Sequence, residues 1–183
     1  KATFQLRIPK VVKRWEEIKD DPADLLARAM LAEEGEKIYK DTWQDLLGVG
    51  WVIRNRHDFW YENIKQDPRY RHYQRVQNED KWLRAATSGI YGMAFDKKVG
   101  FSSDIQANWW RYGKSLEEAV WAYNVAYEMA LKVLGADRSN DPVREAVYYA
   151  DADAEQKPYK RTHFWDENGY SHFWCMPDTD VCQ

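Results

Sequence analysis

Three carboxylates follow an apolar helical pattern near the start of the chain and could do acid–base chemistry: Glu33, Glu34 and Glu36. Steps of three and four along a helix put Glu33 on the same face as three apolar residues, Leu26, Ala29 and Met30. Glu33 lies where this apolar face ends, so we expect its carboxyl group to be partly desolvated. Desolvation raises the pKa of a carboxyl group, and the position therefore predicts a general acid that stays protonated near neutral pH.

The element that must position Glu33 is a helix with clear start and stop signals. Asp21 is a suitable N-cap, and Pro22 fits the first helical position. Gly35 readily adopts the left-handed conformation that ends helices. We expect a helix from about Pro22 to Glu34.

A second helix is expected from about Thr42 to about His57. Thr42 and Asp45 approximate a capping box, and the residues that follow are apolar nearly all round. This helix should therefore be central. Gly48 and Gly50 would let a neighbouring helix approach it closely.

A third helix has the strongest signals in the chain. Ser115 and Glu118 form a capping box, and apolar residues then repeat at helical spacing until Gly135. The predicted buried positions are Leu116, Ala119, Val120, Tyr123, Ala126, Tyr127, Ala130, Val133 and Leu134.

The rest of the chain gives weaker signals. We expect an N-terminal segment over residues 1–20, a connection over 58–78, a short helix over 79–88 and an extended segment at 147–149. Asn168-Gly169 predicts a late β-hairpin that pairs Trp165 with His172 and Phe164 with Phe173. The expected fold class is α+β, mainly α, with residues 21–183 forming a single catalytic domain.

The composition is rich in aromatic residues. Ten Trp and twelve Tyr exceed what an ordinary core of this size needs, and flat aromatic faces can stack on sugar rings. Trp109 and Trp110 could form such a wall, although one of the two should belong to the core because sequence neighbours point in different directions. The alternative is that the aromatic residues simply build the core. The basic, aromatic cluster at 69–75 could touch an anionic polymer or be a solvated loop.

Charge and cysteine content exclude several classes of function. A net charge of -3 argues against a nucleic-acid binder, and no segment is apolar enough to predict a membrane span. Cys175 and Cys182 could close a small loop through a disulfide, which would indicate the periplasm or the cell exterior; two free thiols are the alternative. The four histidines show no zinc-ligand spacing, so we expect no metal and no other cofactor.

The order of short motifs along residues 25–174 resembles that of the SleB-type cell-wall hydrolases, named for the spore-cortex-lytic enzyme. The matching segments are Leu26-Ala27-Arg28, Ala32-Glu33, Gly35-Glu36, the apolar segment from Gly48 to Arg56, Gly100-Phe101-Ser102, Asp141-Pro142, Ala146-Val147-Tyr148-Tyr149 and, more loosely, His172-Phe173. The resemblance implies a lysozyme or lytic-transglycosylase-like fold and cleavage of the glycan strands of peptidoglycan.

The resemblance also implies roles for individual residues. Glu33 matches the family's catalytic acid, while Ser102, Tyr149 and His172 match polar positions of its cleft. The chain carries Glu34 where the family usually has a small residue, and it is one residue shorter before Gly35, so Glu34 is the rival candidate. For His172 the alternative is packing against Trp165.

Hydrolysis needs a further group to hold a water or to stabilise the sugar cation, whereas a lytic transglycosylase can act with one Glu. Candidates for the second carboxylate are Glu36, Asp104 and Asp45. Glu36 could instead cap or form a salt bridge. Asn55 and Arg56 could orient the acid or bind substrate, or they could make hydrogen bonds at a helix end.

The sequence thus predicts a peptidoglycan-cleaving glycosidase, either a muramidase or a lytic transglycosylase, in the periplasm or outside the cell. A non-catalytic glycan-binding module of the same fold is the alternative. The charged N-terminal residues lack the apolar region of a signal peptide. An antibacterial effector or a phage lysis enzyme is therefore a further possibility, with an immunity or delivery protein as partner in the case of an effector.

Overall fold

A computed structural model describes residues 6–10, 20–34, 43–60, 82, 105, 109–146, 148–151, 160–161 and 171–175. The described part is mainly helical. Helix α1 spans Pro22–Glu34, α2 spans Trp43–Asn55 and α6 spans Leu116–Gly135. Short turns of helix follow α2 (η3, Arg56–Trp60) and flank α6 on both sides (η5, Trp109–Arg111, and η6, Arg138–Asn140).

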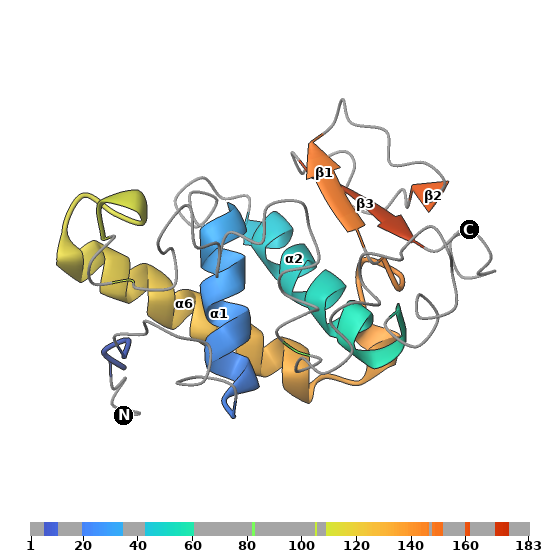
Figure 1. Cartoon of the computed structure of the whole chain (residues 1–183), viewed down its shortest axis with the longest axis horizontal. Coiled ribbons are helices and arrows are strands. Elements are labelled where there is room, and N and C mark those ends of the chain that lie inside the picture. Colours follow the sequence, from blue (N-terminus) through green and yellow to red (C-terminus); the bar gives the residue numbers. More distant parts are fainter. Residues whose placement is uncertain are drawn as a thin grey trace, which may run out of the picture.

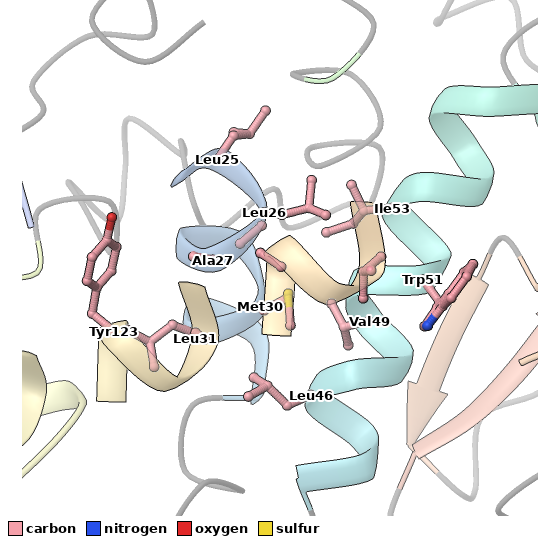
Figure 2. Close-up of a cluster of buried hydrophobic side chains, with 14 of the residues drawn as sticks. Leu25, Leu26, Ala27, Met30, Leu31, Leu46, Val49, Trp51, Ile53 and Tyr123 are labelled. Atoms are coloured by element: carbon pink, nitrogen blue, oxygen red, sulfur yellow. The ribbon is translucent and has the colours of Figure 1, made fainter. Parts of the chain in front are cut away.

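The three α-helices pack against one another around a shared core (Figure 1). Helix α1 crosses α6 and lies beside α2, and the end of α1 is next to the start of α2. Figure 2 shows the same antiparallel arrangement from the side chains. Leu46 lies toward the end of α1 that carries Leu31, while Ile53 lies toward Leu26.

Helix α1 is confirmed with the expected bounds, and its start is capped as expected. The Asp21 carboxylate accepts a hydrogen bond from the Asp24 backbone amide at 3.0 Å. Every residue from 23 to 31 is buried, so the helix is enclosed on all sides rather than on one apolar face. Only its two ends are partly exposed.

A buried polar cluster lies inside the contact between α1 and α6. The Arg28 guanidinium donates to the Asp24 carboxylate at 3.0 Å, and the Tyr123 hydroxyl donates to the same carboxylate oxygen. Burial and the nearby Asp24 charge raise the pKa of Tyr123, so its hydroxyl stays a proton donor. The two opposite charges can remain buried because each satisfies the other.

Helix α2 is central, as its composition indicates. Leu46, Val49, Val52 and Ile53 are fully buried. A side chain added at Gly50 would place its Cβ 2.9 Å from the Met30 sulfur and 3.3 Å from a Val133 methyl group. The expected close approach at Gly50 is thus confirmed, with neighbours on both α1 and α6. Thr42, the other half of the predicted capping box, lies outside the described residues.

Helix α6 begins and ends where expected, and most of its predicted core face is buried. The Ser115 hydroxyl accepts from the Glu118 backbone amide at 3.1 Å. The Glu118 carboxylate accepts a hydrogen bond from the backbone amide of Lys114. In a standard capping box it would accept from the amide of the N-cap residue, here Ser115. The prediction for Leu116 is wrong, because its side chain is 46% exposed in the first turn, before α6 reaches the core.

Three short strands follow the helices: β1 (Tyr148–Asp151), β2 (Lys160–Arg161) and β3 (Ser171–Cys175). They form an antiparallel sheet with β3 between β1 and β2, on the side of α2 (Figure 1). The extended segment expected at Tyr148 and Tyr149 is confirmed. The hairpin turn at 168–169 and its partners Phe164 and Trp165 lie outside the described residues, as does nearly all of the helix expected over 79–88.

No helix in the described ranges has the length and apolar character needed to cross a bilayer.

The packing at Gly50 leads to a test of the helical core. In Gly50→Ala the new methyl group meets the Met30 sulfur and a Val133 methyl, and overpacking of this kind costs about 1–3 kcal/mol. The matched control is Gly135→Ala, where nothing lies within 4 Å of the added Cβ and helix propensity favours Ala by up to about 1 kcal/mol. Urea denaturation should show Gly50→Ala less stable than Gly135→Ala by at least about 1 kcal/mol. Equal stability of the two variants would contradict the close packing of the three helices.

Candidate functional site

Glu33 lies in the last turn of α1, at the point where this buried helix reaches the surface. Its side chain is partly exposed, whereas Ala29 and Met30, one turn earlier, are buried. Ala32 is likewise partly exposed. The described structure therefore places Glu33 where the sequence pattern predicts, at the edge of the apolar core.

Among the other carboxylates proposed for catalysis, the structure describes the side chain of Asp45 alone. Only the backbone of Glu34 is described, while Glu36 and Asp104 lie outside the described residues. Asp45 is fully buried in the first turn of α2. A carboxylate with no exposed surface cannot touch a substrate, so Asp45 is not favoured as the second catalytic group.

Asn55 and Arg56 lie at the opposite end of α2 from Glu33. Because α1 and α2 run antiparallel, the end of α2, which Asn55 occupies, lies toward the start of α1 (Figure 1). The structure does not bring Asn55 and Arg56 to the predicted acid.

The Asn55 side chain instead makes hydrogen bonds inside the protein. It is fully buried, and its amide donates to the Asp141 carboxylate at 2.9 Å and to the Ala146 carbonyl at 3.0 Å. Its carbonyl oxygen accepts from Arg138 at 3.2 Å. These hydrogen bonds match the helix-end alternative considered from the sequence. They fasten the end of α2 to the segment that follows α6.

A second polar cluster, which the sequence analysis did not single out, surrounds Asp58 in η3. One carboxylate oxygen of Asp58 lies 2.9 Å from His57 Nδ1, and the other accepts from Arg138 at 2.7 Å and from Arg54 at 3.4 Å. The His57 ring stacks on Trp82, with ring centroids 3.7 Å apart. The four-residue spacing of Arg54 and Asp58 is the one signal that could have revealed this cluster.

Charges around Asp58 hold its carboxylate in the ionised form. Burial alone would raise the pKa of Asp58, but the hydrogen bond with His57 and the positive charge of Arg138 outweigh burial and lower it. Arg54 also donates to the carbonyls of Val133 and Ala136 at the end of α6. The cluster thus connects η3, α2 and the end of α6, which is a structural role.

Trp109 and Trp110 form an exposed aromatic pair directly before α6. Trp109 is 36% exposed and Trp110 61%, so the expectation that one of them belongs to the core is wrong. Both lie in the short turn η5, in which none of the three residues is buried. The Arg111 guanidinium lies over the Trp110 ring, 5.2 Å from its centroid. A flat ring beside a cation suits contact with a polar, ring-shaped ligand such as a sugar.

The remaining predicted site residues are placed by backbone alone or lie outside the described residues. Tyr149 is opposite Phe173, and His172 is opposite Ala150, in the pairing of β1 with β3. The register therefore puts Tyr149 and His172 at adjacent, non-paired positions of one sheet. Cys175 ends β3. Ser102 and Cys182 lie outside the described residues.

Comparison with protein-family models, curated proteins and solved structures finds no match to this chain.

Within the part of the chain that the structure describes, no three or more His, Cys, Asp or Glu side chains group in a way that could hold a metal ion.

The Asp58 cluster predicts a pH-dependent contribution to stability. The folded-state pKa of Asp58 lies below that of the unfolded chain, about 3.9, so the unfolded state takes up the proton first as the pH falls. Its stabilisation should be complete above about pH 5 and decline through pH 4 and below. Asp58→Asn should cost about 1–2 kcal/mol at pH 7 and progressively less toward pH 3.

Urea denaturation of both proteins between pH 3 and pH 7 measures this difference. Asp20→Asn, at an exposed position, controls for the change in net charge and should follow the unsubstituted protein. A difference between Asp58→Asn and the unsubstituted protein that stays constant from pH 7 to pH 3 would show that ionisation of Asp58 does not matter.

Proposed function

We propose that the chain is a glycosidase that cleaves the glycan strands of peptidoglycan, with Glu33 as its general acid. The observation that carries the proposal is the position of Glu33, partly exposed near the end of a helix in which residues 23–31 are all buried. An acid at the edge of an apolar core is partly desolvated yet within reach of a substrate. A general acid in glycoside cleavage must reach the leaving oxygen in this way in order to donate its proton.

Three further features support the proposal. The order of motifs resembles that of SleB-type hydrolases, and the described part of the chain is mainly helical, as is the α+β, mainly α class expected from the sequence. Trp109 and Trp110 offer exposed aromatic faces for sugar rings. In a muramidase Glu36 would serve as the second carboxylate, whereas in a lytic transglycosylase the C6 hydroxyl of the sugar attacks and no second carboxylate is needed.

Asn55 and Arg56 do not belong to the proposed substrate site. Asn55 is buried and holds the segment after α6, and both residues lie at the far end of α2 from Glu33. Tyr149 and His172, in neighbouring strands, and Ser102 remain in the proposal as cleft residues through the family resemblance. The site is proposed to work without metal or other cofactor, in a periplasmic or extracellular location that a Cys175–Cys182 disulfide would suit.

Substitution of the acid tests the proposal directly. Glu33→Gln removes the proton donor while keeping size and hydrogen bonding, and loss of a general acid lowers the rate by roughly 10²–10⁴-fold. Digestion of purified peptidoglycan, followed by mass spectrometry of the released muropeptides, measures the activity. The matched control is Glu34→Gln, which should lower the rate less than about tenfold.

The products and the variants separate the competing hypotheses. Anhydro ends identify a lytic transglycosylase and reducing ends a muramidase, while new free amines without glycan cleavage would overturn the glycosidase proposal. A large loss in Glu34→Gln alone would transfer the role of the acid to Glu34. Binding of peptidoglycan without any cleavage by the unsubstituted protein would indicate the glycan-binding module.

The exposed tryptophans of η5 allow a separate test of glycan binding. Trp110→Ala should raise KM for soluble glycan fragments about fivefold or more, because a stacking platform is lost, with kcat changed less. Its effect on the free energy of unfolding should stay within about 0.5 kcal/mol, since the side chain is largely exposed. Trp121→Ala, at a 44% exposed position on α6, is the matched control and should leave KM unchanged. Equal KM values for the two variants would remove Trp110 from the substrate site.

A further inference from the structure

Arg111, in the turn η5, carries a positive charge that no carboxylate in the described part of the chain neutralises. Its side chain is exposed, and none of the ion pairs in that part includes it. The two acidic residues that follow it, Glu117 and Glu118, are not its partners, and the Glu118 carboxylate accepts from the Lys114 backbone amide at 2.6 Å instead. A guanidinium is weakly hydrated and has several donors, so Arg111 is available to an anion from outside.

The Trp110 ring remains open to a ligand although the Arg111 guanidinium lies over it, 5.2 Å from the centroid. The exposed fraction of Trp110, 61%, is measured with that guanidinium in place. Trp109, next to it in the same turn, is 36% exposed. Aromatic faces of this kind can stack on sugar rings. An exposed aromatic surface and a cation without a counter-charge therefore occur together in one turn of three residues.

The turn that carries both groups is packed on the start of α6, at the end of this helix away from the three-stranded sheet (Figure 1). Tyr112, which follows η5, is buried, and its backbone amide donates to the Trp109 carbonyl at 2.9 Å. A Cβ added at Gly113 would lie 2.6 Å from the Glu118 Cβ, so the backbone here lies directly against the first turn of α6. A ligand thus meets side chains on an ordered backbone, which lowers the entropy cost of binding.

We propose that Trp109, Trp110 and Arg111 form a platform for a sugar strand that carries free carboxylates, with the rings against a sugar and Arg111 paired with a carboxylate. The choice of strand rests on the proposed function: alternate sugars of peptidoglycan carry a short peptide with free carboxylates, which neutral glycans such as chitin lack. Arg111 is then the residue that distinguishes the two. The net charge of -3 works against an anionic ligand, so a preference for carboxylates requires a local cation.

Two forms of one ligand test the role of Arg111. The probes are a disaccharide-peptide fragment of peptidoglycan with free carboxylates and the same fragment with its carboxylates converted to amides. Each is titrated by calorimetry into full-length Glu33→Gln, in which cleavage is blocked. The fragment with free carboxylates should bind at least about threefold more tightly at low salt. The ratio should approach one at about 1 M salt, where the Debye length is only about 3 Å.

Charge-matched variants in the same Glu33→Gln background separate Arg111 from general electrostatics. Arg111→Gln should lower the ratio to about one, whereas Lys114→Gln, which also removes an exposed positive charge, should keep it at about threefold or more. Trp110→Ala should weaken binding of the amidated fragment about fivefold or more, because that binding depends on stacking. An unchanged ratio in Arg111→Gln, or equal binding of the two fragments by Glu33→Gln itself, would overturn the proposal.

The binding experiment and the cleavage experiment fail separately. Selective binding of the carboxylate form, without cleavage of peptidoglycan by the unsubstituted protein, would support the platform and overturn the glycosidase. Cleavage of peptidoglycan with no preference for the carboxylate form would overturn the platform and leave the glycosidase standing.

Discussion

The enclosure of α1 is the constraint on which the rest of the described structure depends. Nine consecutive residues of this helix are buried, so every polar group among them must find a partner inside the protein. Asp24 and Arg28 meet this requirement through each other and through Tyr123 on α6. The same enclosure leaves only the ends of α1 for contact with solvent. Asp21 at one end and Glu33 at the other are therefore the positions where this helix can serve another purpose.

Local sequence signals predicted the helices well, because caps and periodicity act over a few residues. The Asp21 cap, the bounds of α1 and the close approach at Gly50 could all be predicted in this way. Leu116 shows the limit of the method, since its spacing fits the apolar face but the first turn of α6 extends beyond the core. Periodicity specifies a face of a helix, and it does not specify where the neighbouring elements end.

The candidate site could be predicted only in part, for a related reason. Glu33 followed from the pattern of its own helix, and its environment agrees with that pattern. Asn55 was also a candidate from the sequence. Its distance from Glu33 depends on the antiparallel arrangement of α1 and α2, which no local signal specifies. Its partner Arg138 is 83 residues away, and Arg7 is 117 residues from Asn124, its hydrogen-bond partner. Contacts at such separations become visible only in the folded chain.

The turn after α6 connects the helices to the sheet under strain. Arg144 and Glu145 both have positive φ, at 50° and 61°, a conformation that costs non-glycine residues about 1–2 kcal/mol each. Asp141 holds this backbone by accepting from the amides of Val143 and Glu145, while Asn55 holds Asp141. Strand β1 begins three residues after Glu145. Its folded structure is thus coupled to Asn55, the last residue of α2. Sheet and helices should consequently lose structure as one cooperative unit, and hydrogen exchange in β1 should follow that of the helical core.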